Sequence, residues 1–151
     1  MMTQKTSPAA LMSPFVRKFY DEAFALLIEW RNVVAFRTGE SQAEMSQTDK
    51  LLFSARSLEL TTGLAHLMAW VLSRRAVCAG EIAGDEVFDA RFAQACDNPL
   101  LSLNTADESR EAVAMPSAYH DILRRSIMLC ERAKRLEDTE RARLAPASTQ
   151  G

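Results

Sequence analysis

The chain has 151 residues, of which 48% are hydrophobic and 25% are charged, and its net charge is −2. This composition fits a single globular domain and excludes a disordered or fibrous chain. The slightly acidic balance offers no overall basic surface to nucleic acid, and five glycines with five prolines are few for an all-β fold.

Residues 1–12 are polar and Ala-rich, and we expect a flexible arm there. They lack the apolar run of a secretory signal, and no segment approaches the roughly 18 consecutive apolar residues of a membrane span. The three cysteines, Cys78, Cys96 and Cys130, form no CxxC pair. We therefore expect a cytoplasmic protein with free thiols, no metal and no membrane contact.

A first helix is predicted from Ser13 and Pro14, with Ser at the N-cap and Pro at the first helical position. It extends to about Thr38, where Gly39 provides a stop. One face of this helix carries apolar residues at helical spacing, namely Phe15, Phe19, Ala23, Leu26, Trp30 and Val33.

A second, longer helix is predicted to end just before Gly80. Two serines are candidates for its N-cap, and in each case the first helical residue would be the one directly after the serine. Ser41 with Glu44 fits the capping-box pattern better, whereas Ser46 with Asp49 would start the helix five residues later. The sequence leaves both starts open.

A short helix is predicted over residues 85–95, with Val87, Phe88, Phe92 and Ala95 on one side. Asp97-Asn98-Pro99 ends it, because the residue before a proline avoids helical dihedrals. Residues 96–115 then form a loop. Acids outnumber bases by eight to two over residues 80–111, a local charge of −6. This segment is either a solvated connector or a docking surface for a basic partner.

The last helix is predicted from Pro116 to about Leu144, and residues 145–151 have the composition of a tail. Apolar and small residues recur every three or four positions in a heptad-like seam: Tyr119, Ile122, Ser126, Leu129, Ala133 and Leu136. The predicted fold is an all-α three-helix bundle, a single domain over residues 13–144, with an extra short helix after the second long one.

The second helix carries two apolar stripes on nearly opposite sides. We call the first the Leu/Ala stripe: Leu51, Ala55, Leu58, Thr62, Ala65, Ala69, Leu72 and Ala76. We call the other the Leu-rich stripe: Phe53, Leu60, Leu64, Leu67, Val71 and Cys78.

Two opposed stripes predict burial on both sides of this helix. The small residues permit close approach of another helix. Leu60, Leu64, Leu67 and Val71 form either the core or a dimer contact, and the sequence does not say which stripe faces a second copy. The predicted arrangement is a homodimer, and the alternative is the central helix of a monomeric bundle.

Polar flanks run between the two stripes. We expect an exposed contact surface for partner proteins there: Glu59, His66, Trp70, Arg74 and Arg75. Gly63 lies in the middle of the helix, where glycine costs about 1 kcal/mol relative to alanine. It predicts either a close approach by another backbone or a bend.

Several segments together resemble the signature of a known family. They are Ser57-Leu58-Glu59-Leu60-Thr61-Thr62-Gly63-Leu64, Trp70, Arg75-Ala76-Val77 and Gly80-Glu81-Ile82, with Phe19-Tyr20-Asp21-Glu22-Ala23 before them and Met115-Pro116, Ser126 and Glu131-Arg132 after them. The set is similar to the small alphaproteobacterial proteins whose type member is the regulator of CtrA degradation (RcdA), formerly a domain of unknown function, DUF1465. The resemblance covers roughly residues 15–137.

This resemblance implies a cytoplasmic three-helix bundle that dimerises and has no enzymatic activity. It implies an adaptor, a protein that helps a ClpXP-type ATP-dependent protease receive substrates such as cell-cycle regulators. A dimeric scaffold with other partners is the alternative.

The sequence contains few motifs that are typical of other function classes. The two histidines, His66 and His120, stand in no metal-binding spacing, and no nucleotide-binding or hydrolase motif occurs. Phosphotransfer modules are helical bundles with one exposed histidine, often followed by Lys and Gly, but Ala69 and Trp70 stand at those positions after His66. We therefore expect no catalytic residues and no cofactor.

Overall fold

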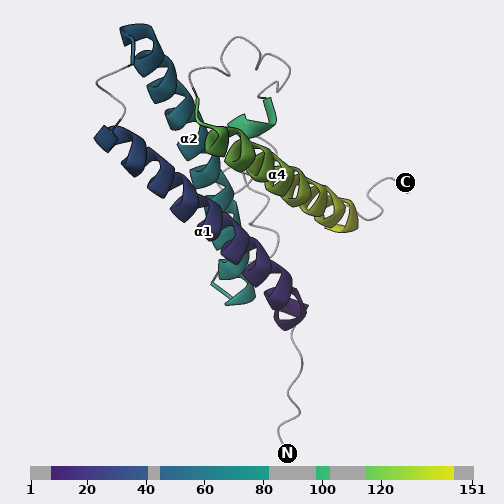
Figure 1. The fold of residues 1–151 in the computed structure, drawn as a ribbon. Helices are drawn as coiled ribbons and strands as arrows, with labels where there is room; N and C mark the ends of the chain where they lie inside the picture. The colour runs from purple at the N-terminus through teal and green to yellow at the C-terminus, as the bar shows by residue number, and fades with distance from the viewer. Residues whose placement is uncertain (1–7, 41–44, 82–97, 103–114, 145–151) are drawn as a thin grey trace, which may run out of the picture.

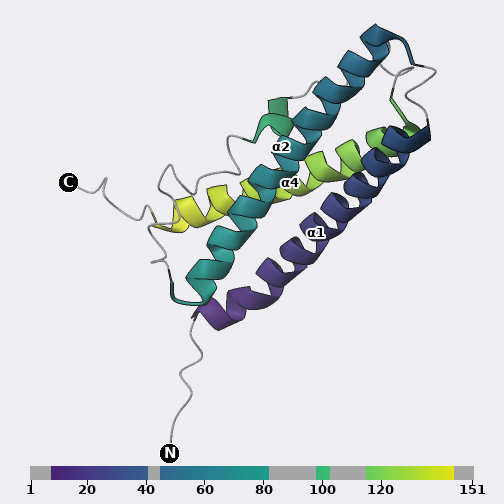
Figure 2. The same ribbon diagram turned by 90° about the vertical axis from the view of Figure 1, so that its left-hand side faces the viewer.

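The computed structural model describes residues 8–40, 45–81, 98–102 and 115–144. These residues form the helices α1 (Pro8–Glu40), α2 (Gln47–Cys78) and α4 (Ser117–Leu144), and the short 3-10 helix η2 (Pro99–Ser102). α1 and α2 form an antiparallel hairpin, and α4 crosses one side of it (Figure 1, Figure 2). The predicted all-α bundle of three long helices is confirmed.

The start of α1 differs from the prediction. The helix begins at Pro8 and continues through Pro14, so the predicted start at residue 14 is wrong, and the predicted flexible arm overlaps the first turns of α1. Pro8 stands at the first helical position, where its missing N–H costs nothing. The following Ala9-Ala10-Leu11 has high helix propensity.

α2 starts at the second of the two predicted capping signals. The backbone N–H of Asp49 donates to Ser46 Oγ at 3.1 Å, which satisfies one of the free donors of the first turn. At the other end, Gly80 has a φ of 77° and Glu81 N–H donates to Ala76 O at 2.9 Å. This Schellman motif uses glycine because the left-handed conformation strains residues with a Cβ.

The core is formed where the three helices meet. The predicted seam of α4 is confirmed, with its first five residues buried and Leu136 packed against them. In α1, Phe19, Ala23, Leu26 and Trp30 are buried as predicted. Phe15 is an exception, because 66% of it is exposed, so its assignment to the buried face is wrong.

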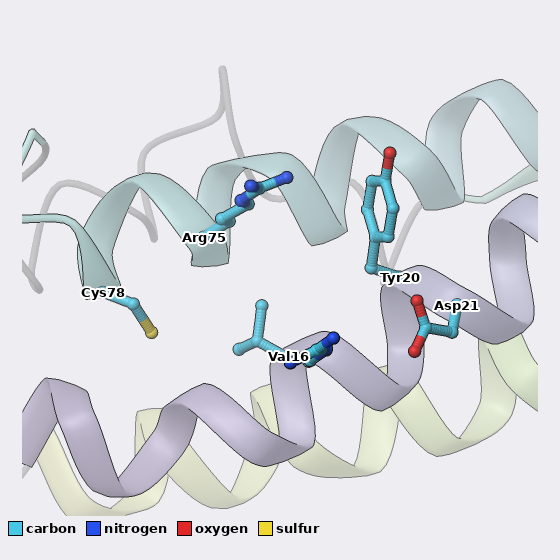
Figure 3. Close-up of a pocket in the computed structure, with 6 residues that line it drawn as sticks. Val16, Tyr20, Asp21, Arg75 and Cys78 are labelled. Carbon is cyan, nitrogen blue, oxygen red and sulfur yellow. The ribbon is translucent and has the colours of Figure 1, made fainter.

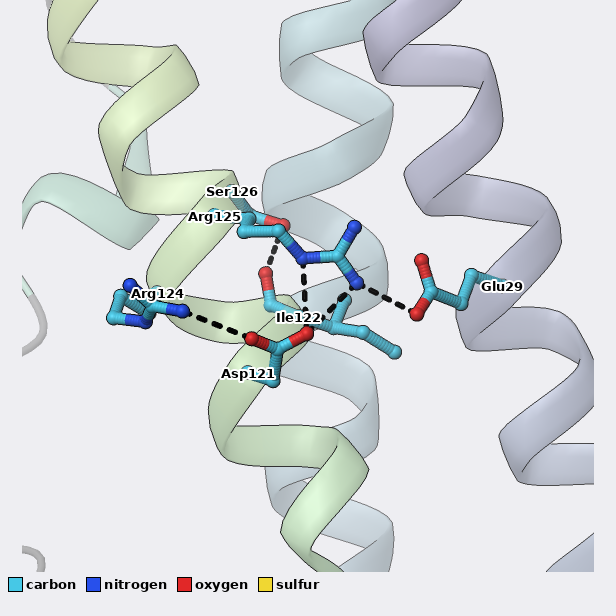
Figure 4. A network of polar contacts seen from close by, with 6 residues as sticks. All are labelled: Glu29, Asp121, Ile122, Arg124, Arg125 and Ser126. Carbon is cyan, nitrogen blue, oxygen red and sulfur yellow. Dashed lines mark hydrogen bonds and ion pairs between the residues drawn. The ribbon is translucent and has the colours of Figure 1, made fainter.

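Ionic contacts on the outside of the bundle join α1 to α4 (Figure 4). Arg125 donates to Glu29 at 2.6 Å and to Asp121 at 3.0 Å, and Arg124 donates to Asp121 at 3.0 Å. The hydrogen bond from Arg124 lowers the pKa of Asp121, and the hydrogen bond to Glu29 raises the pKa of Arg125. Exposed pairs like these add little stability but fix the relative position of the two helices.

Part of the predicted 96–115 loop is ordered and buried, which corrects that prediction. Asn98 donates through Nδ2 to Gly63 O at 3.0 Å and accepts from Leu100 N–H at 3.0 Å. These two bonds hold η2 against the middle of α2. The predicted helix at 85–95 and most of the acidic segment 80–111 lie outside the described residues.

Leu100 explains the glycine in α2. A Cβ built on Gly63 would lie 2.1 Å from Leu100 Cγ, far inside van der Waals contact. Both residues are buried, so the group that approaches Gly63 is a leucine side chain of the same chain and not the backbone of another helix that the sequence predicted.

We therefore expect Gly63→Ala to lower the free energy of unfolding. Overpacking of this kind costs about 1–3 kcal/mol, which outweighs the gain of about 1 kcal/mol in helix propensity, because η2 cannot move without breaking the Asn98 bonds. Urea titration followed by circular dichroism measures the change.

The matched control is the double variant Gly63→Ala/Leu100→Ala. Removing the leucine side chain opens room for the new methyl group, so the cost of Gly63→Ala should be smaller in a Leu100→Ala background. Equal costs in both backgrounds would contradict the steric explanation.

Candidate functional site

The Leu-rich stripe of α2 is the core of the single chain. Leu60, Leu64, Leu67 and Val71 are all fully buried, and they pack against α1 and α4 in one hydrophobic cluster. The sequence predicted either a core position or a dimer contact for these residues, and the structure places them in the core.

The Leu/Ala stripe lies on the opposite side of α2 and stays exposed. Leu51 and Leu58 are each 68% exposed, and Leu72 is 47% exposed. Ala55, Thr62, Ala65 and Ala69 are also exposed, and Ala76 is half-buried. A row of leucines this open to water is unusual on a monomer and is typical of a surface that binds another protein.

The predicted polar flank is only partly a surface. Glu59 and His66 are half-buried and Arg75 is exposed, so these three remain candidates for partner contact. The expected exposure of Trp70 and Arg74 is wrong, because Trp70 is 1% exposed and Arg74 is 6% exposed. Phe19 of α1 contacts Trp70, and Glu137 and Glu140 of α4 contact Arg74.

Trp70 and Arg74 instead belong to a buried cluster that ties the three helices together. The Arg74 guanidinium lies over the Trp70 ring, 5.1 Å from its centre, and Trp70 meets Phe19 of α1 edge-on at 5.4 Å. From α4, Glu140 accepts a hydrogen bond from Arg74. The fully buried Glu137 lies 3.8 Å from the same guanidinium.

Arg75 turns the other way, into a hollow of about 380 Å³ between α1 and α2. Its guanidinium lies over the ring of Tyr20, 5.5 Å from the centre, and Figure 3 shows Val16, Asp21 and Cys78 around it. Arg17 completes the lining. Cations beside an apolar floor suit an acidic side chain with an apolar neighbour.

The arrangement of these helices can be compared with known proteins. A family model described as a protein of unknown function, DUF1465, matches residues 8–150. The chain belongs to the DUF1465 family. No curated protein matches it, and no solved structure does.

Two further exposed apolar groups of this DUF1465 chain were missed from the sequence. Phe24 and Ile28, one turn apart on α1, are partly exposed, and Phe24 stacks on Tyr20 at 5.9 Å. On α4, Met128 is exposed in a shallow groove between Arg125 and Arg132. Helical spacing could have revealed the first group, because Phe24 and Ile28 are four residues apart.

The described part of the chain offers few side chains for cysteine or metal chemistry. Cys78 and Cys130 are free thiols, while Cys96 lies outside the described residues. Burial raises the pKa of Cys130 to about 12, which makes its thiol unreactive. Within the described ranges, no three His, Cys, Asp or Glu side chains could hold a metal ion, and no helix is long and apolar enough to cross a membrane.

Proposed function

We propose that this chain is a non-enzymatic interaction protein that works as a homodimer in the cytoplasm. Its role is that of an adaptor, which helps deliver substrates such as cell-cycle regulators to a ClpXP-type ATP-dependent protease. The observation that carries the proposal is the exposed Leu/Ala stripe of α2, with Leu51 and Leu58 each 68% exposed.

The geometry supports an interaction protein more than any other class. The exposed Leu/Ala stripe is a helix face, which matches another helix and not a small molecule. The described residues that line the hollow between α1 and α2 include Arg17, Asp21, Arg75 and Cys78, and no histidine is among them. Charged side chains on these helices suit the docking of other proteins.

The adaptor role itself rests on the resemblance to the RcdA family. The residues that carry this resemblance are spread over all three helices, from Phe19 to Arg132, and membership in DUF1465 covers residues 8–150. The alternative is a dimeric helical scaffold with other partners, which the exposed stripe would serve equally well.

A degradation assay separates the two roles. Tagged protein is first used to capture partners from a lysate of its host, and any cell-cycle regulator found is purified as a client. The client is then incubated with ClpXP-type protease and ATP, with and without this protein. An adaptor raises the initial rate of client degradation, whereas an unchanged rate would leave only the scaffold.

The dimer is tested by Leu58→Asp. This change places a charge in the middle of the exposed stripe, so the variant should sediment as a monomer and keep its helical circular dichroism spectrum. Phe36→Asp on α1 is the matched control, because Phe36 is 69% exposed and lies off the stripe. Dimers of equal stability in both variants would contradict a role for the stripe.

A further inference from the structure

The Leu/Ala stripe repeats with the period of a coiled coil. Its eight residues, from Leu51 to Ala76, are spaced alternately by four and three positions, an average of 3.5 residues that keeps one seam facing a partner helix. The stripe lies opposite the buried face of α2, so neither α1 nor α4 blocks access to it.

We infer that the stripe pairs with the same stripe of a second copy, in antiparallel orientation, about a two-fold axis between Gly63 and Leu64. This inference rests on the proposed dimer and adds its direction and register. In this register, the residue numbers of the two members of a pair add up to the same value for every pair along the seam. The pairs are Leu51 with the partner's Ala76, Ala55 with the partner's Leu72, Leu58 with the partner's Ala69, and Thr62 with the partner's Ala65.

Side-chain volume selects this register. Each of the outer layers contains one leucine and one alanine, so large side chains face small ones and the helices keep one separation. The central layer of Thr62 and the partner's Ala65 is smaller, which suits the point where two crossing helices come closest. A parallel pair would instead contain three layers of two leucines and five layers of two small residues, and so could not keep one separation.

The charges beside the seam agree with the same axis. Glu59 and His66 lie on one flank of α2, both half-buried, and the two-fold axis sets each Glu59 beside the partner's His66. On the other flank, Arg75 comes beside the partner's Ser54. No acid faces an acid and no base faces a base, so the pairing carries no repulsion.

The size of the surface fits a dimer as well. The stripe runs about 38 Å along α2, and a helix 10–12 Å across presents roughly 400 Å² of projected face over that length. Two copies contribute about twice this area, roughly 800 Å² before the relief of the side chains is counted, which is below the roughly 1,000 Å² of a stable interface and in the range of a weak dimer.

Spin labels test the direction of pairing. Single cysteines replace Lys50, Ser54 or Glu59 in a Cys78→Ser/Cys96→Ser background, and the buried Cys130 stays unlabelled because its pKa is about 12. In the antiparallel register, a label and the same label of the second copy are offset along the helix axis by about 40 Å at position 50, 28 Å at position 54 and 14 Å at position 59, at 1.5 Å per residue. Pulsed dipolar spectroscopy should therefore give distances that shorten steadily from position 50 to position 59.

Two other outcomes are possible: one would overturn the antiparallel register, and the other would overturn the dimer. Three short and similar distances would mean a parallel dimer, and the register would fail while the proposed dimer stands. Monomers in sedimentation, with no dipolar signal, would overturn the dimer itself and assign the stripe to another protein. Circular dichroism of each labelled chain checks that it is folded, and any unfolded variant is replaced by a label at the exposed Gln47, for which the antiparallel offset is about 50 Å.

Discussion

Replacing Leu67 by aspartate is expected to leave the chain unfolded. Leu67 is fully buried in the cluster between α1, α2 and α4. Loss of a buried leucine costs about 2–5 kcal/mol, and an unpaired carboxylate in its place adds a large desolvation cost. The sum is comparable to the whole stability of a domain, about 5–15 kcal/mol. Circular dichroism at 25 °C should show little helix.

The contrast with Leu58→Asp makes this result informative. Both leucines lie on α2, and they differ in exposure, 0% for Leu67 against 68% for Leu58. We expect the first substitution to remove the fold and the second to remove only self-association. If Leu67→Asp gave a well-folded chain, the division of α2 into a core face and an exposed face would be wrong.

The second large effect is expected from Arg74→Met. Arg74 is buried between the Trp70 ring and the carboxylates of Glu137 and Glu140. Removing one member of a buried ionic cluster costs about 3–5 kcal/mol, because the remaining charges stay buried without their partner. Urea unfolding of the variant should show a loss of this size, although Glu137 keeps a contact of 3.6 Å with Arg141.

Two comparisons identify the cause of the loss. Arg75→Met removes an exposed arginine that lies over Tyr20 and should cost no more than about 1 kcal/mol. Adding Glu137→Met to Arg74→Met should recover much of the loss, because an apolar pair of similar volume replaces the ions. A double variant as unstable as the single one would mean that the loss does not come from leaving the Glu137 carboxylate without Arg74.

The sequence predicted those parts of the fold that depend on local pattern. The seam of α4 from Tyr119 to Leu136 and the stop at Gly80 follow from spacing or from a single residue's conformation, whereas the cap at Ser46 was one of two that the sequence left open. The start of α1 was missed because Pro8 and Pro14 carry the same signal for a first helical position. The sequence cannot tell which of two such prolines begins the helix.

The candidate surface was predicted in outline and corrected in detail. Periodicity separated the two stripes of α2, but it could not assign one to the core, because that depends on where α1 and α4 pack. Trp70 and Arg74 were expected at the surface for the same reason. Glu137 and Glu140 bury Arg74 from more than 60 residues away in sequence, and Asn98 fixes η2 by contacts that no local pattern shows.

The two faces of α2 have a consequence for every stability measurement on this protein. If the Leu/Ala stripe is covered by a second copy, association and folding share one helix and form a linked equilibrium. Each tenfold dilution of the protomer would then lower the free energy of unfolding of the dimer by about 1.4 kcal/mol. Melting temperatures of variants would then be comparable only at one protomer concentration, and a substitution on the exposed face, such as Leu58→Asp, would lower the melting temperature without touching the core.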